Sequence, residues 1–274
     1  TLNRLRENDQ MTISDLQKTN QVLRQLDRNK LEFIQVAAHE LRTPLTVLKG
    51  YINLLRATPE LKDKTSITEM MDGIAKGADR MHEVVNMMLD VSRIDSETMK
   101  VLPAQIPLKM TLTELIHSLA KETAERKIQV SVEQEASIVS IHADPSLIQK
   151  ALYQLLVNAI KYTPDGGKVK INVQNTILEN DIPAVDIRFE DSGVGIDSEH
   201  HELIFEKFYQ VGDVALHSSG KTAFKSGGPG LGVAIVRGIA KAHGGYVWVE
   251  SKGHDEVNFS GSVFHFVVPV DSKQ

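Results

Sequence analysis

The chain has 274 residues, enough for about two domains that each bury a core. Hydrophobic residues make up 41% and charged residues 24%, and no run approaches the ~18 apolar residues of a membrane span. This composition excludes a disordered tail, and the formal charge of −5 argues against a nucleic-acid partner. Because the chain has no cysteine, a disulfide scaffold, a cysteine nucleophile and a thiolate metal site are also excluded.

The composition changes near residues 100–110. All 8 methionines precede residue 111, and most of the 18 glycines follow it. Two prolines at positions 103 and 107 interrupt any helix there. We predict a helix over 1–32, a helical domain over 33–100, a linker over 101–110 and a second domain over 111–270. Since the chain begins with Thr1 rather than Met, we also expect it to be a piece of a longer protein.

The first half is expected to be helical throughout. One seven-residue register is typical of an imperfect parallel coiled coil, because some of its positions are polar; a solvated single helix is the alternative. The apolar positions are Leu2, Leu5, Leu16, Leu23, Leu26, Phe33 and Ala37. A second amphipathic helix is expected from Ser66 to about Ile94. Two such helices make a poor core, so we predict an all-α helical hairpin that forms a four-helix bundle in a dimer.

In the second half, helical and strand patterns alternate. We predict an α+β two-layer sandwich whose strands follow one another as hairpin-like pairs. The expected helices cover 111–126, 144–162 and 231–243, and the expected strands cover 128–134, 138–142, 168–178, 184–191, 246–251 and 262–269.

His39 precedes Glu40 in a helical stretch that contains Pro44. A neutral imidazole is a good nucleophile, and a neighbouring carboxylate can take the proton that it releases. Thr43 lies four residues after His39, on the same helical face. A single histidine on a helix is more often an ordinary residue, so this pattern alone does not decide the function.

Asp191 falls on the apolar face of the strand expected over 184–191, and two glycines follow it at positions 193 and 195. A buried carboxylate needs a hydrogen-bond donor, and an adenine amino group would supply one. Glycines let a flat ligand approach the backbone closely. The string Asp-x-Gly-x-Gly is more often a plain turn.

Two further segments suit a nucleotide. Asn158, Lys161 and Tyr162 share one helical face, and their side chains suit magnesium, phosphate and a nucleoside respectively, although a polar edge beside the core would have the same pattern. The glycines at 227–232 precede a helix and would form an anion site. The irregular segment before them contains Lys221 and Lys225 and is expected to be a lid.

Taken together, these segments resemble the boxes of sensor histidine kinases. They are His39–Pro44 for the H box, Leu155–Pro164 for the N box, Asp191–Ile196 for G1, Ile204–Phe208 for the F box and Gly228–Gly232 for G2. Five boxes in the family's order make the resemblance specific, and it covers about residues 30–270. It implies that a dimerisation and phosphotransfer domain precedes an ATP-binding domain of the Bergerat type.

The resemblance also implies the role of each residue. His39 would accept the phosphoryl group, Glu40 would be its base, and Thr43 would position water if the enzyme also removes phosphate from its partner. ATP and Mg²⁺ would be the cofactors, with Asn158 as the metal ligand. The implied nucleotide-binding residues are Asn158, Lys161, Tyr162, Asp191, Gly193, Gly195, Ile196, Phe205, Lys207, Lys221, Lys225, Gly228, Gly230, Leu231 and Gly232.

The resemblance implies that this core is cytoplasmic and homodimeric, with a response regulator as partner and a sensor domain upstream. Attachment of the full-length protein to a membrane stays open. Gln154 and Pro229 depart from the family pattern. Gln154 stands where water-activating relatives carry a glutamate base, and an amide cannot take a proton, which argues against a chaperone-like ATPase. Two alternatives stay open: a non-catalytic signalling scaffold that senses ATP, and a core whose main activity is phosphatase.

Overall fold

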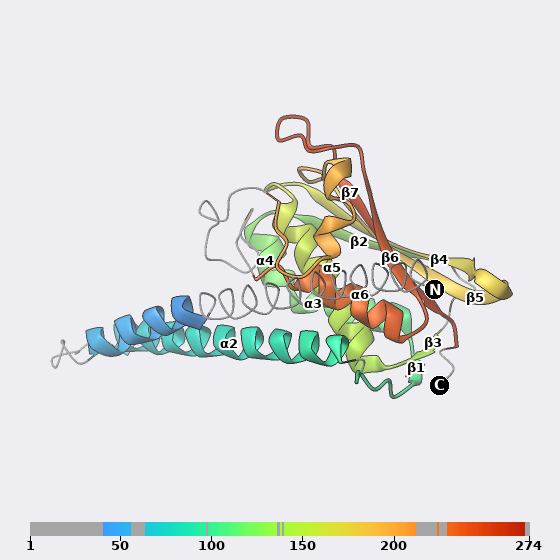
Figure 1. Ribbon diagram of the computed structural model, residues 1–274. Coiled ribbons are helices and arrows are strands. Elements are labelled where there is room, and N and C mark those ends of the chain that lie inside the picture. The colour runs from blue at the N-terminus through green and yellow to red at the C-terminus, as the bar shows by residue number, and fades with distance from the viewer. Residues whose placement is uncertain are drawn as a thin grey trace, which may run out of the picture. The chain divides into compact units, whose positions relative to one another are not determined.

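The computed structural model describes residues 41–55, 64–96, 98–135, 138, 140–211, 224 and 229–271. The chain divides into two compact units, Thr1–Val84 and Val85–Gln274. No helix in the described ranges is both long enough and apolar enough to cross a membrane. The two units are described separately below (Figure 1).

The first unit contains a helical segment over 41–55 and most of α2 (Lys64–Asp95). Gly73 and Gly77 of α2 make room for side chains of the earlier segment. A Cβ at Gly73 would lie 2.3 Å from the ring of Tyr51, and one at Gly77 would lie 3.0 Å from Leu48. Leu48 thus lies against Gly77, and the later residue Tyr51 lies against the earlier residue Gly73. The two helices are therefore antiparallel and form a hairpin, as predicted.

The second unit holds a five-stranded sheet with the strand order β2-β4-β5-β7-β6, and a two-stranded sheet of β1 and β3. Its strands are β1 (Ala104–Ile106), β2 (Gln129–Gln134), β3 (Ile141–Ala143), β4 (Lys168–Leu178), β5 (Ile182–Asp191), β6 (Tyr246–Ser251) and β7 (Ser262–Pro269). Its helices are α3 (Leu108–Ser118), α4 (Ala120–Glu125), α5 (Pro145–Tyr162) and α6 (Gly232–Ala242), with short 3₁₀ turns η1 (Glu179–Asp181), η2 (Ser198–His200) and η3 (Leu203–Phe205).

The helices pack on one face of the large sheet, which gives the two-layer α+β sandwich that the sequence predicted (Figure 1). On β5, Ile187 and Phe189 point into the core between the layers and are fully buried. Apolar residues of α5 and α6 meet them from the other layer, among them Leu152, Leu155 and Ile239. Burying each such side chain contributes about 1.5–3 kcal/mol, so this interface holds the second unit together.

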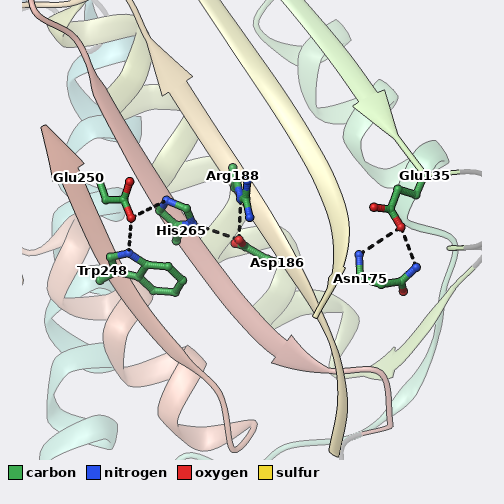
Figure 2. A network of polar contacts seen from close by, with 7 residues as sticks. All are labelled: Glu135, Asn175, Asp186, Arg188, Trp248, Glu250 and His265. Atoms are coloured by element: carbon green, nitrogen blue, oxygen red, sulfur yellow. Dashed lines mark hydrogen bonds and ion pairs between the residues drawn. The ribbon is translucent and has the colours of Figure 1, made fainter. Parts of the chain in front are cut away.

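Alternate residues of β5, β6 and β7 form a polar network on the opposite face of the sheet (Figure 2). Asp186 accepts hydrogen bonds from Arg188 Nε at 2.6 Å and from His265 Nδ1 at 3.0 Å. The ring of His265 stacks on Trp248, with centroids 4.1 Å apart. The network lets Asp186 be almost fully buried while its charge stays paired.

Three details differ from the sequence prediction. The helix expected over 111–126 is two helices, α3 and α4, because the chain leaves the helical conformation at Leu119. The strands are not all hairpin pairs, since β2 pairs with β4 in parallel. A parallel pair needs a crossover connection, and β3 and α5 lie in the chain between these two strands. Strand β1 and the first residues of α3 lie within the predicted linker segment.

Candidate functional site

Helix α5 carries three of the predicted site residues on its last turns. Asp144 caps the start of the helix, since its Oδ1 accepts hydrogen bonds from the N–H groups of Ser146 at 3.0 Å and Leu147 at 3.1 Å. The apolar stripe of α5 is buried against the core. Asn158, Lys161 and Tyr162 therefore lie at the edge of this stripe and are only half-buried.

Arg126 fixes the end of α5. Its Nη1 donates to the carbonyl of Ile160 at 2.7 Å and its Nη2 to the carbonyl of Thr163 at 2.6 Å. A cation at these carbonyls satisfies acceptors that the helix itself leaves open. Next to this clamp, Lys161 Nζ lies 4.7 Å from the ring centroid of Tyr162. The cation and the aromatic ring of the predicted site are therefore adjacent.

Asp191 is the last residue of β5 and only 6% exposed. Its Oδ1 accepts a hydrogen bond from the N–H of Gly193 at 2.8 Å. Burial raises the pKa of Asp191 to about 7, although hydrogen bonds from the N–H groups of Gly193 and Ser262 act in the opposite direction. A carboxylate in this position is a strong acceptor for a ligand N–H group.

The loop after Asp191, residues 191–197, packs directly on the end of α5. We call it the G1 loop. The N–H of Val194 donates to the carbonyl of Tyr162 at 3.2 Å. A Cβ at Gly193 would lie 2.4 Å from the same carbonyl oxygen. The structure thus brings Asp191 next to the helix end that carries Lys161 and Tyr162.

The start of α6 lies against the other end of this α5 face. A Cβ at Gly232 would lie 2.8 Å from Oε1 of Gln154, so the start of this helix packs closely on the Gln154 side chain. Gly230 has φ +66° and accepts a hydrogen bond from the N–H of Phe208 at 2.9 Å. Leu231 is fully buried. Three separate segments of the sequence therefore lie together: α5, the G1 loop and the start of α6.

The two F-box residues lie differently. Phe205 is buried and meets Phe264 edge-on, with centroids 6.3 Å apart, so it packs in the core. Lys207 forms an ion pair with Asp95, in the part of α2 that belongs to the second unit. Ile196 is half-buried, and its N–H donates to Ser251 Oγ at 2.9 Å.

The remaining predicted residues divide into two groups. Thr43 is exposed on the helical segment 41–55. His39, Glu40, Lys221, Lys225 and Gly228 lie outside the described residues.

Sequence reasoning missed the residues that support Asp191 from β6 and β7. Ser262 pairs with Asp191 in the β5–β7 ladder and donates its N–H to the carboxylate. Ser251 contacts the G1 loop from the end of β6. The glycines at 253 and 261, which bound the segment between these strands, were the available signal.

The residues of this site fit ATP with Mg²⁺. Asp191 offers a buried acceptor, and within the described part of the chain no cation shifts its pKa, which suits an amino group better than a metal. No cluster of three histidines or carboxylates within the described ranges could hold a metal alone. Mg²⁺ is commonly held by one or two protein oxygens together with substrate phosphates, and the side-chain amide of Asn158 has an oxygen of this kind.

Two family matches cover most of the chain. Residues 29–97 match the His Kinase A (phospho-acceptor) domain. Residues 143–272 match the histidine kinase-, DNA gyrase B- and HSP90-like ATPase domain.

Among curated proteins, the chain is similar to hybrid signal transduction histidine kinase D of Dictyostelium discoideum, with 28% identity over 94% of this chain and 16% of the relative. It is also similar to the sensor protein kinase WalK of Staphylococcus saprophyticus, with 29% identity over 83% of this chain and 35% of the relative. The chain thus spans little more than a third of these relatives at most.

Among solved structures, the Acinetobacter baumannii histidine kinase AdeS matches with a TM-score of 0.60 and 20% identity, over 85% of this chain and 98% of that chain. Histidine kinase ThkA, in complex with response regulator protein TrrA, matches with a TM-score of 0.56 and 24% identity, over 88% of this chain and 63% of that chain. At these identities the two likenesses show the fold.

The two-layer unit, with its buried aspartate and glycine-rich segments, is therefore an ATPase domain of the class shared by histidine kinases, gyrase and Hsp90. Because a phospho-acceptor domain precedes it, the chain belongs to the sensor histidine kinases and comprises the catalytic core. The predicted helical hairpin followed by an α+β sandwich is confirmed.

Proposed function

We propose that this core transfers the γ-phosphoryl group of ATP to His39 and then to an aspartate of a response regulator. The observation that supports it best is the placement of buried Asp191 beside the end of α5 that carries Lys161 and Tyr162. The phospho-acceptor match over residues 29–97 includes His39.

In this proposal, the carboxylate of Asp191 accepts the adenine amino N–H, and Tyr162 packs beside the nucleoside. Lys161 binds a phosphate, and Asn158 would hold Mg²⁺ with the phosphate oxygens. When bound, Mg²⁺ would neutralise charge on the transferring group. Since phosphoryl transfer depends mainly on positioning and charge, these residues supply most of what the reaction needs.

The transfer forms a bond between a His39 ring nitrogen and phosphorus and breaks the bond from the γ-phosphorus to the bridging oxygen, so that ADP leaves. Glu40 takes the imidazole proton. Gln154, which lies against Gly232, cannot act as a base toward water. This supports transfer to a histidine rather than simple ATP hydrolysis.

We further propose that the core is a homodimer. Several large apolar side chains of the first unit are exposed, and a second copy would cover them in a four-helix bundle; they are Leu45, Val47, Ile52, Leu54 and Met71. A response regulator is the proposed partner because ThkA is similar in fold and its structure contains one. We place this core in the cytoplasm, and Thr43 would serve reverse dephosphorylation.

The test is incubation with γ-labelled ATP and Mg²⁺, comparing wild type with His39→Gln, Asn158→Ala and the control His117→Gln. His117 is exposed on α3 and is not among the predicted site residues. We expect acid-labile, base-stable label on wild type and on His117→Gln, and none on the other two. Label on His39→Gln would refute the proposal, and ATP binding without any label would favour the signalling scaffold.

A further inference from the structure

The connection between β6 and β7 packs against the G1 loop along its length. We call residues 252–261 the β6–β7 loop. The N–H of Gly261 donates to the carbonyl of Gly193 at 2.9 Å, and the N–H of Asp255 donates to the carbonyl of Val194 at 2.7 Å. The N–H of His254 donates to Oδ1 of Asp197 at 2.7 Å. The β6–β7 loop therefore holds the G1 loop at its middle and at its last residue.

Ser251 joins the two loops through one hydroxyl group. Its Oγ accepts the hydrogen bond from the N–H of Ile196 at 2.9 Å and donates to the carbonyl of Gly261 at 2.7 Å. Both backbone groups are paired by a side chain from a third segment, the end of β6. Removing the hydroxyl would leave both groups without this partner.

The fit between the loops is too close for side chains at the contact. A Cβ at Gly195 would lie 1.9 Å from Ser260 Oγ and 2.1 Å from the carbonyl oxygen of Gly253. A Cβ at Gly261 would lie 2.4 Å from the carbonyl oxygen of Asp191. The second glycine of the G1 motif is therefore needed for contact with the β6–β7 loop.

The β6–β7 loop is also ordered within itself. The carboxylate of Asp255 accepts hydrogen bonds from the N–H groups of Asn258 and Val257 and from the Asn258 side chain. These hydrogen bonds, first that from the Asn258 N–H, lower the pKa of Asp255. The loop thus presents a fixed surface to the G1 loop.

We propose that Ser251 is a positioning residue for nucleotide selection, which it sets by fixing the G1 loop so that Asp191 faces the adenine amino group. This rests on the proposed ATP-binding function. The Ser251 hydroxyl hydrogen-bonds Ile196 and Gly261, at the part of the site that would contact the base rather than at Asn158 or Lys161. Its loss should therefore weaken and broaden nucleotide recognition with little effect on phosphoryl transfer.

The experiment uses the whole chain and measures competition of ATP and GTP with a fluorescent ATP analogue, together with autophosphorylation kinetics. The variants are Ser251→Ala, Ser251→Thr, which keeps the hydroxyl, and the control Ser118→Ala, whose Oγ donates to the Leu115 carbonyl at the end of α3. For Ser251→Ala we expect affinity for ATP to fall about five- to twentyfold, as for one lost bridging hydroxyl. Preference for ATP over GTP should fall as well.

The maximal autophosphorylation rate should stay within about twofold of wild type, because binding rather than the transition state is affected. Ser251→Thr should restore both affinity and preference. If Ser251→Ala does not fold, Asp197→Ala replaces it, since Asp197 is exposed and holds the β6–β7 loop through His254.

Unchanged ATP affinity and ATP/GTP preference in folded Ser251→Ala would overturn the positioning role of Ser251. An equal loss of affinity in Ser251→Thr would also overturn it, because that variant keeps the hydroxyl. A wild-type chain that binds no nucleotide would instead overturn the proposed function.

Discussion

The backbone N–H of Leu102 donates a hydrogen bond to Oδ2 of Asp144, at 2.9 Å. Oδ1 of the same carboxylate caps α5. One side chain thus ties the segment that follows α2 to the helix that carries Asn158. Burial would raise the pKa of Asp144, but hydrogen bonds, first that from the Leu102 N–H, outweigh it and lower the pKa. The carboxylate of Asp144 is therefore charged in the folded protein and stabilises the start of α5.

Asp144→Ala should destabilise the second unit by about 1–3 kcal/mol, because it removes a helix cap and leaves the Leu102 N–H without its partner. The measurement is urea unfolding at pH 7. Glu114→Ala, an exposed substitution on α3, is the control and should stay within about 0.5 kcal/mol of wild type. Equal stability of the two variants would contradict the role of Asp144.

Nucleotide affinity should depend on pH through Asp191, whose pKa is raised to about 7 by burial. Only the ionised carboxylate is an acceptor at both oxygens, so ATP affinity should rise from pH 6 to pH 8. Calorimetric titration of wild type and Asp191→Asn over this range tests it. The variant should bind weakly at every pH, and a retained pH dependence would show that another group is responsible.

The same residue makes the nucleotide-free protein less stable at higher pH. Its folded pKa of about 7 lies above the usual value of 3.8, so the folded state holds more protons between these values and stability falls as pH rises through them. Asp191→Asn should therefore stabilise the nucleotide-free protein at pH 8, by an amount on the order of 2–4 kcal/mol. Thermal unfolding at pH 5 and pH 8 gives the comparison, and the gain should shrink at pH 5.

His243 should remain neutral at pH values where an ordinary histidine is charged. Its Nε2 accepts a hydrogen bond from the Asp144 N–H at 3.1 Å, and its Nδ1–H donates to the Ile239 carbonyl at 2.8 Å. Burial lowers the pKa of His243. The stability contributed by the neutral ring is present above the unfolded value of about 6.5 and is lost as pH falls below it. NMR titration of the ring should show a midpoint below 6.5, and a midpoint above that value would refute this.

Two glycines with positive φ provide a matched pair. Gly195 has φ +72° and would place a Cβ within 2.1 Å of two atoms, whereas Gly166 has φ +82° and nothing within 4 Å. Gly166→Ala should lose about 1 kcal/mol of stability from backbone strain alone. Gly195→Ala should lose clearly more and should also bind ATP more weakly, because the G1 loop must shift. Equal losses in both variants would mean that the contact with the β6–β7 loop is dispensable.

Local patterns predicted most of the second unit. Strands β4, β6 and β7 lie at the predicted residues, because alternating apolar residues report one buried face of a sheet. Strand β1 was missed, since three residues are too few to show a period. The parallel pairing of β2 with β4 was missed because pairing depends on contacts between distant segments.

The residues of the candidate site were also predictable only in part. Asp191, Asn158 and the glycines are recognisable from short strings, yet the reason for Gly195 is not. It makes room for Ser260 and Gly253, more than fifty residues away in the printed sequence. Ser251 likewise acts on Ile196 from a distant strand. Such supports become visible only when the fold places them side by side.

The short sheet of β1 and β3 has a consequence for how this unit can be connected to others. His142 of β3 forms a bridge with Asp271, and its N–H donates to the Val270 carbonyl at 2.7 Å, while Gln105 of β1 pairs with His142 from the other side. Strand β1, at the start of the two-layer fold, and residues 270–271, after its last strand, therefore both pair with β3. A domain with neighbouring ends can be inserted into longer chains, or exchanged between them, without disruption of its fold.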